Sequence, residues 1–322
     1  MSRILRRCVV ALLIAASAGA SAQQAKRARV GVLLFSSPEN DPNLATFRQG
    51  LAELGYVEGR NLTTLYRYAE GKPERLPQLA RELVALRPDV IFALGGDVAP
   101  SARTASNSIP IIAAVSVDPV RSGLVPSLAR PGGNISGVTY VSSELAAKRL
   151  QLLKEAIPNI ARVAVLWNPD HVDPEYADTQ GAGRTLGVRV QSLEVRGPDD
   201  FDAAFRAAAA EQAQALIVIS SRLMTFQRQR IMEFADRRRI PVVAGWGPWA
   251  QGGALMSYGP DLNLSVRRAA AYVDRVLKGA SPADLPVEQP TKFDLVINLK
   301  TAKNLGVTIP ASLRVQAAQV IE

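Results

Sequence analysis

Short apolar runs alternate with longer amphipathic stretches along most of the chain, and this pattern predicts strands and helices in turn. In the first half, the apolar runs predict strands at 29–35, 61–68, 89–94 and 109–115. The stretches that follow them predict helices at 44–54, 74–86, 100–106 and 120–128. Buried strands separated by helices are typical of a mostly parallel sheet with helices on both faces.

The same order of elements starts again in the second half. Arg162-Val-Ala-Val-Leu-Trp167 repeats the pattern that begins at Arg29, and Ile240-Pro-Val-Val-Ala244 repeats Ile109-Pro-Ile-Ile-Ala113. Strands are expected between them at 187–195 and 215–219. Because the offset is about 130 residues, it indicates two similar domains and not a solenoid of short repeats. We therefore predict an α/β fold with two doubly wound parallel-sheet lobes.

The chain is expected to pass between the lobes several times, which makes a multi-strand hinge. Lobe one is predicted at 28–138 and lobe two at 139–257, with a boundary near Gly137–Tyr140 and a helix that opens at Ser142-Ser143-Glu144. The C-terminal part predicts an extended segment, a helix, a proline-rich loop, a strand and a short helix at 253–259, 262–277, 282–290, 293–299 and 301–305. We expect 258–290 to return to lobe one and 291–322 to return to lobe two.

The first 22 residues have the pattern of a secretion signal. Arg3, Arg6 and Arg7 precede a continuous apolar run from Val9 to Ala20 that is too short to span a bilayer. Ala20-Ser21-Ala22 has the small-x-small pattern of a cleavage site, so the mature chain is expected to begin near Gln23. The protein is therefore predicted to be periplasmic.

Composition narrows the function. The single cysteine, Cys8, lies inside the predicted signal, so disulfides, thiol catalysis and cysteine-bound metals are not expected in the mature chain. Without the signal, the net charge falls from +9 to about +6. The remaining basic residues are dispersed and have few aromatic neighbours, which argues against a nucleic-acid groove. Neither a cofactor nor a metal is expected.

Ligands of open parallel α/β sheets bind beyond the carboxyl ends of the strands, so the residues at these positions are the candidate site. They offer hydroxyls, carboxylates, an amide, a glycine backbone and one large aromatic side chain, as a small-molecule pocket does. The candidates are Ser36, Ser37, Gly96, Asp97, Ser116, Asp118, Asn168, Ser220, Ser221 and Trp246.

Each candidate also has a structural interpretation. Asp118-Pro119 and Asn168-Pro169 fit a helix N-cap followed by proline. Ser36-Ser37 is compatible with a turn, Asp97 with a helix cap, and Trp246 with core packing. Gly95-Gly96 lacks the third glycine of a phosphate-binding fingerprint, so a nucleotide site is not expected.

His171 is the only histidine and lies in a polar loop after a predicted strand. A catalytic role would require a serine neighbour and an orienting acid, and the serine elbow of α/β-hydrolases is absent. A lone histidine also lacks partners at metal-ligand spacing. We expect a solvated loop residue.

Four long motifs resemble a family of ABC-transporter substrate-binding proteins, the tryptophan/tyrosine type. They span 47–61, 118–137, 252–259 and 278–306, and the resemblance covers essentially all of the chain after the predicted signal. It implies a type I periplasmic-binding fold and a receptor that delivers a small solute to a membrane permease and ATPase. The match supports Asp118 in Asp-Pro-Val and adds Tyr258 in Met-Ser-Tyr-Gly. Residues 244–249 depart from the family pattern, so ligand identity is not carried over.

The predicted mechanism is closure of the two lobes on a solute. Asp118 would pair with a cationic or amino group, the serine hydroxyls and loop amides would bind a carboxylate or carbonyl, and Trp246 or Tyr140 would cover an apolar part. A monomeric, non-enzymatic binding protein of an importer is expected, with an amino acid among the possible solutes. The alternatives are a ligand-sensing module of a membrane receptor and a hydrolase that uses Ser220 or Ser221 with His171.

Overall fold

The computed structural model describes residues 27–39, 41, 43–140 and 145–322. The predicted signal peptide and its cleavage site near Ala22 lie outside the described residues, as do Ser142-Ser143-Glu144, where a helix was expected to open.

Lobe one is built on a five-stranded parallel sheet in the order β2-β1-β3-β4-β5. Its strands are β1 (Ala28–Leu34), β2 (Leu62–Tyr68), β3 (Val90–Leu94), β4 (Ile111–Val115) and β5 (Ile135–Thr139). The helices between them are α2 (Leu44–Glu53), α3 (Leu76–Ala85) and α4 (Ala99–Ala105). β3 and β4 are buried along their whole length, because helices cover both faces of the sheet.

Lobe two repeats this topology and adds two strands, so its order is β12-β11-β10-β9-β8-β6-β7. The strands are β6 (Arg162–Trp167), β7 (Arg189–Glu194), β8 (Ala215–Val218), β9 (Val242–Ala244), β10 (Met256–Gly259), β11 (Asp294–Asn298) and β12 (Gln319–Ile321). The order β7-β6-β8-β9-β10 reproduces the order of the first sheet, which confirms the predicted pair of doubly wound lobes. Only the pairing of β11 with β10 is antiparallel among the described strands.

Eight helices that belong to the second lobe surround this sheet in the described part of the chain. They are α5 (Ala146–Ala156), α6 (Glu175–Leu186), α7 (Phe201–Ala210), α8 (Arg222–Phe226), α9 (Arg228–Arg238), α10 (Gly247–Gln251), α12 (Leu299–Leu305) and α13 (Ala311–Gln316).

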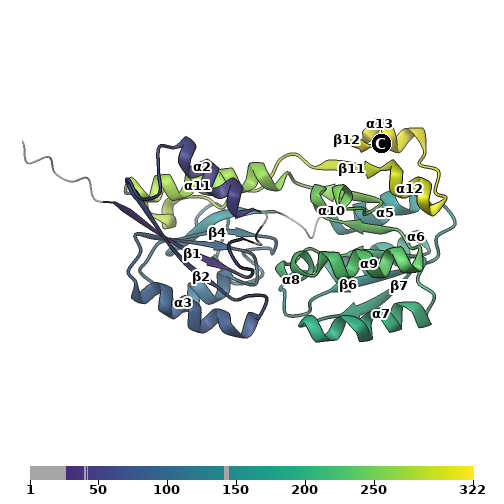
Figure 1. Ribbon diagram of the computed structural model, residues 1–322, viewed down its shortest axis with the longest axis horizontal. Coiled ribbons are helices and arrows are strands. Elements are labelled where there is room, and N and C mark those ends of the chain that lie inside the picture. Colours follow the sequence, from purple (N-terminus) through teal and green to yellow (C-terminus); the bar gives the residue numbers. More distant parts are fainter. Residues whose placement is uncertain (1–26, 40, 42, 141–144) are drawn as a thin grey trace, which may run out of the picture.

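The chain crosses between the lobes three times (Figure 1). It leaves lobe one after β5, returns after β10 to form α11 (Leu262–Leu277), and passes back into β11. α11 packs against α2 and the strands of lobe one. Three separate connections form a hinge region, while the exact lobe boundaries at 138, 258 and 290 stay a prediction.

One expected helix is absent from the described structure. Residues 119–123 form a turn in place of a helix at 120–128. The carboxylate of Asp118 accepts hydrogen bonds from the backbone N–H groups of Val120 and Arg121. Gly123 then adopts a φ of 71°, a left-handed conformation that ends the turn. The apolar residues Leu124 and Val125 pack into the core from an irregular segment.

Candidate functional site

Side chains of both lobes meet where the carboxyl ends of the two parallel sheets face each other. From lobe one, Asp97 follows β3 and Ser116 follows β4. From lobe two, His171 follows β6 and Arg222 begins α8 just after β8. Direct hydrogen bonds join these residues across the lobes, so we call this region the lobe junction.

His171 lies at the centre of the lobe junction and is only 4% exposed. Its Nδ1 hydrogen-bonds the carboxylate of Asp97, and its Nε2 lies 3.1 Å from Ser116 Oγ and 3.4 Å from Asp173 Oδ2. The prediction of a solvated loop histidine is therefore wrong. His171 is buried because Asn168 holds the loop in a tight turn. The Asn168 side chain accepts a hydrogen bond from the Asp170 N–H, and the Asn168 backbone carbonyl accepts one from the His171 N–H. This turn directs His171 toward the junction.

The charges around His171 set its protonation. Burial opposes the charged form, but the carboxylates of Asp97 and Asp173 outweigh this effect and raise the pKa of His171 above its ordinary value of 6.5. Burial also opposes ionisation of Asp97, yet His171 and Arg222 hold the pKa of Asp97 below 3.8. For Asp173, burial prevails and raises the pKa to about 6. His171 thus bridges the lobes, and the neighbouring carboxylates favour its protonated form.

A second ion pair crosses the junction. The Arg222 guanidinium, 5% exposed, binds the buried carboxylate of Asp41, and the Arg222 backbone N–H donates to Asp97 Oδ2 at 3.2 Å. Asp41 also accepts the hydroxyl of Ser36 at 3.1 Å and the N–H of Asn43 at 3.0 Å. A buried ion pair stabilises a structure only when such further hydrogen bonds satisfy its remaining atoms, as they do for this carboxylate.

Two adjacent glycines let lobe two approach this closely. Gly95 has a φ of 123°, and a Cβ atom there would overlap Arg222 Cγ. A Cβ atom on Gly96 would lie 2.6 Å from both His171 Cε1 and Val117 Cγ1. The glycine pair therefore serves the contact between the lobes as well as the turn after β3.

Several buried polar atoms at the junction have no hydrogen-bond partner. They include, as donors, the Tyr140 hydroxyl, the Ser220 hydroxyl, Arg222 Nε and Trp246 Nε1 and, as an acceptor, Asp173 Oδ2. The rings of Tyr140 and Trp246 form an edge-to-face pair with centroids 5.9 Å apart. Unpaired polar atoms at buried positions cost free energy, so in native proteins they usually have a protein, water or ligand partner. They are the groups that a bound solute could satisfy.

A buried ion pair of lobe two, Arg149 with Glu175, lies behind Ser220 and Tyr258 at the junction. Arg149 donates from Nε to the backbone oxygen of Tyr258 at 2.9 Å and pairs with the buried carboxylate of Glu175. Burial lowers the pKa of Arg149 to about 10, although the charge of Asp173 opposes this shift. A Cβ atom on Gly245 would overlap Ser220 Oγ and lie 2.8 Å from Arg149 Nη2, so this glycine makes room for both side chains.

The twelve predicted site residues divide into three groups. The junction brings together Ser36, Gly96, Asp97, Ser116, Tyr140, Ser220 and Trp246. Asp118 and Asn168 accept backbone N–H groups of the turns that follow them, so the alternative of a helix N-cap is wrong in that no helix begins there, and Ser221 is the N-cap of α8. Ser37 is half-buried beside Ser36, and Tyr258 contributes its carbonyl to Arg149 while its ring packs against Phe293. Ligand contact by any of the twelve stays a prediction.

Five charged residues of this region were not among the predicted site residues. They are Asp41, Arg149, Asp173, Glu175 and Arg222. Arg222 directly follows the candidates Ser220-Ser221, and Asp41 lies in the loop after the first strand, so a wider window at each strand end would have included both. Arg149 lies within a helix and carries no local signal of burial.

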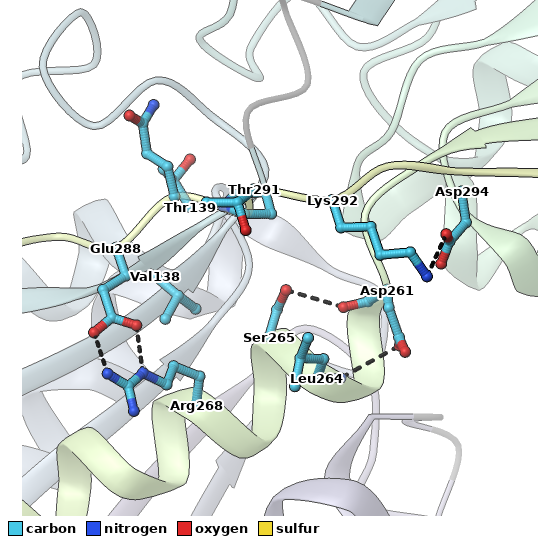
Figure 2. Close-up of a pocket in the computed structure, with 12 residues that line it drawn as sticks. Val138, Thr139, Asp261, Leu264, Ser265, Arg268, Glu288, Thr291, Lys292 and Asp294 are labelled. Carbon is cyan, nitrogen blue, oxygen red and sulfur yellow. Dashed lines mark hydrogen bonds and ion pairs between the residues drawn. The ribbon is translucent and has the colours of Figure 1, made fainter.

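A separate groove of about 270 Å³ lies at the hinge, between the start of α11 and the crossover into β11 (Figure 2). Its charged side chains pair with one another. Arg268 forms a two-pronged ion pair with Glu288, and Lys292 lies 3.0 Å from Asp294. Asp261 caps α11 through the N–H groups of Asn263 and Leu264. These ion pairs and the helix cap join α11 to the crossover into β11.

The part of the chain that the structure describes holds no cluster of three or more His, Cys, Asp or Glu side chains able to hold a metal ion. In the same residues, no helix has the length and apolar character needed to cross a membrane.

Known proteins resemble this chain along almost its full length. A tyrosine-binding protein of Clostridioides difficile (strain R20291) is 26% identical over 284 residues, which cover 87% of this chain and 81% of that protein. A Streptococcus pneumoniae ABC domain in complex with L-Trp is 26% identical, with a TM-score of 0.84 over 92% of this chain and all of the other. A conserved domain protein of Vibrio cholerae O1 biovar El Tor is 29% identical, with a TM-score of 0.83 over the same shares.

These likenesses confirm the type I periplasmic-binding fold that the sequence motifs implied. The family model of ABC transporter substrate-binding proteins matches residues 29–321. The chain therefore belongs to the family of ABC transporter substrate-binding proteins.

Proposed function

We propose that this protein is the extracytoplasmic receptor of an ABC-type importer and that it binds its solute at the lobe junction. The observation that carries the proposal is the set of unpartnered buried groups at Tyr140, Ser220, Arg222 and Trp246, at the carboxyl ends of both sheets. Ligands of this fold class bind at that position. Contacts from both lobes would let the solute favour the closed form through its higher affinity for that form.

The solute in this proposal is small and polar or aromatic, and an amino acid is one possibility. Two relatives support the size and class, since one is a tyrosine-binding protein and another was solved with L-Trp. The buried rings of Tyr140 and Trp246 would supply the apolar wall that such a solute requires.

The remaining parts of the proposal concern the cell. A signal peptide cleaved near Ala22 would send the protein to the periplasm, where it would work as a monomer and deliver its solute to a membrane permease. Lobe one would comprise 28–138 with 258–290, and lobe two 139–257 with 291–322. A ligand-sensing module of a membrane receptor would have the same junction, and a neighbouring kinase or chemoreceptor gene in place of permease and ATPase genes would favour it.

One feature of the junction favours a hydrolase as the second candidate. Ser116, His171 and Asp97 are hydrogen-bonded in the order of a Ser-His-Asp triad, although the predicted hydrolase used Ser220 or Ser221. A general base must be neutral, whereas two carboxylates raise the pKa of His171 and so favour its protonated form. We therefore propose that these residues hold the lobes together. Turnover of p-nitrophenyl esters that disappears in Ser116→Ala would overturn this assignment.

A thermal-shift screen of the mature chain tests the proposed function. The panel would contain amino acids, aromatic acids, nucleobases, polyamines and short peptides, with mass spectrometry of the denatured protein's extract to detect a co-purified solute. A solute at a hundred times its Kd should add about 2.7 kcal/mol to the free energy of unfolding. If no panel solute raises the Tm and the extract holds no small molecule, the proposal fails.

A further inference from the structure

One face of the short helix α8 in lobe two lies against lobe one. Its residues Arg222 and Phe226 are four positions apart, so they lie on the same side of the helix. The Arg222 guanidinium binds the Asp41 carboxylate. The Phe226 ring meets the Phe35 ring edge-to-face, with centroids 6.1 Å apart. This helix face therefore joins the lobes by an ion pair and by an apolar contact.

The lobe-one partners of this face follow three neighbouring strands. β2, β1 and β3 lie side by side in the sheet of lobe one. Phe35 and Asp41 come after β1. Gly71 comes after β2, and Gly95 comes after β3. α8 thus packs across the carboxyl ends of three strands, which is a wider contact than one ion pair provides.

Two glycines of lobe one leave room for α8. A Cβ atom on Gly71 would lie 2.7 Å from Phe226 Cε1. A Cβ atom on Gly95 would overlap Arg222 Cγ. Both glycines have a positive φ, but Gly59 has one as well, and an added Cβ atom there would meet no atom within 4 Å. The fit of lobe one to α8 is thus a feature separate from the backbone conformation of these glycines.

The apolar part of this contact is independent of the groups proposed for the solute. Phe35, Gly71 and Phe226 have no polar side-chain atom, so none of their side chains would exchange a hydrogen bond with a solute. Phe35 is 1% exposed and Phe226 is 40% exposed, so the aromatic pair lies at the rim of the junction with Phe226 outermost. Apolar surface that is buried between the lobes favours closure with or without a solute.

We infer that α8 is a latch that favours the closed form before the solute binds. In this role Phe226 is a positioning residue, because it acts on the solute only through the position of the lobes. The inference rests on the proposed solute-binding function and adds a determinant of its affinity. A ligand binds more tightly when a larger fraction of the protein is already in the form that binds it. The latch therefore raises solute affinity without touching the solute.

Pulsed electron paramagnetic resonance on the unliganded protein tests the latch. Spin labels at Gln78→Cys and Ala203→Cys, two exposed positions on α3 and α7, report the distance between the lobes. Phe226→Ala removes the aromatic contact, and Gly71→Ala places a methyl group against the Phe226 ring. Both variants should shift the unliganded distance distribution toward longer distances, because they weaken the closed form only.

Gly59→Ala is the matched control for Gly71→Ala. The two glycines have φ values of 79° and 80°, so alanine introduces the same backbone strain into lobe one at both positions. At Gly59 the added methyl group meets no atom within 4 Å. Its unliganded distance distribution should therefore match that of the wild type. Equal distributions for wild type, Phe226→Ala and Gly71→Ala would overturn the latch.

Calorimetric titration with the solute that raises the Tm most gives the second readout. One aromatic pair changes an equilibrium by about two- to tenfold, so the Kd should increase by a factor in this range in Phe226→Ala and stay the same in Gly59→Ala. A purely structural role would lower the unliganded Tm and leave both the distances and the Kd unchanged. That result would overturn the latch and leave the proposed function intact.

The opposite failure is also distinguishable. If no solute raises the Tm and the extract holds no small molecule, the proposed function fails. The unliganded distance distributions of Phe226→Ala and Gly71→Ala then still decide whether α8 holds the lobes closed, because they require no solute.

Discussion

His171 stabilises the contact between the lobes through its protonated ring, so this contribution is present only while the ring is protonated. Its pKa in the folded protein is raised above 6.5, so its contribution is complete below pH 6.5 and is lost as the pH rises through the folded value. The charged and polar groups that face it are Asp97 and Ser116 from lobe one and Asp173 from lobe two. Asp173, with a pKa raised to about 6, acts in the same direction between pH 3.8 and about 6.

We therefore predict that the Tm of the wild-type protein falls as the pH rises from 6.5 to 9. His171→Gln should flatten this part of the profile, because the chain has no other histidine. The measurement is a series of thermal melts of both proteins across this range. Parallel profiles for wild type and variant would show that the His171 proton does not stabilise the junction.

The variant Gly96→Ala tests how closely the two lobes approach each other at the junction. Gly96→Ala places a Cβ atom 2.6 Å from His171 Cε1, and overpacking of this kind costs about 1–3 kcal/mol. The overlap with His171 arises only where the lobes meet, so solute affinity should decrease roughly five- to 150-fold, while the overlap with Val117 of the same lobe should also lower the unliganded Tm. Gly197→Ala, where an added Cβ meets no atom within 4 Å, is the control. Equal affinities for the two variants would contradict the close approach.

At the scale of elements, hinge helix α11 depends on a cap at its start. Asp261 accepts the N–H of Asn263 at 2.8 Å and of Leu264 at 3.3 Å. Asp261→Ala should lower the free energy of unfolding by about 1 kcal/mol, as measured by urea denaturation. Asp199→Ala, at an exposed acidic residue of lobe two, should have a much smaller effect. If the two variants are equally stable, the cap does not stabilise the hinge helix.

Most elements could be predicted from local pattern, because central strands such as β3 and β4 are short, fully apolar runs between turn residues. The match is close for the helix at Leu262–Leu277 and the strand at Arg162–Trp167, where sequence periodicity and tertiary packing agree. The expected helix at 120–128 is wrong because the Asp118 carboxylate and the left-handed conformation of Gly123 form a turn at this place. Leu124 and Val125 are buried, but they lie in an irregular segment and not on the apolar face of a helix.

The candidate site could be predicted only as a location. Strand-end position identified Asp97, Ser116, Ser220 and Trp246, since parallel strands bring their carboxyl ends to one edge. The ion pair of Arg222 with Asp41 could not be predicted, because the two residues are 181 positions apart. The ion pair of Arg149 with Glu175 could not be predicted either, because Arg149 lies within α5 and nothing in the local sequence indicates that it is buried. The environment of His171 is likewise set by the opposite lobe.

At the scale of the whole molecule, the Asp41–Arg222 pair is expected to select the closed form. Arg222→Met removes the guanidinium and leaves a buried carboxylate unpaired only when the lobes are closed, a situation that costs about 3–5 kcal/mol. Solute affinity should therefore fall by about two orders of magnitude or more. The double variant Asp41→Asn with Arg222→Met should recover part of this loss in the same titration. A single variant with wild-type affinity would show that the pair does not favour closure.

The distance between the lobes, measured with and without solute, tests most directly whether the two lobes close on a ligand. Residues 23–322 contain no cysteine, so in a chain that begins at Gln23 the variants Gln78→Cys on α3 and Ala203→Cys on α7 give one exposed spin-label position on each lobe. Pulsed electron paramagnetic resonance would be recorded on protein stripped of solute by unfolding and refolding, and again after addition of the solute that raises the Tm most. We predict a broad distribution that becomes shorter and narrower with solute. A distribution that the bound solute leaves unchanged would contradict closure of the two lobes on a ligand.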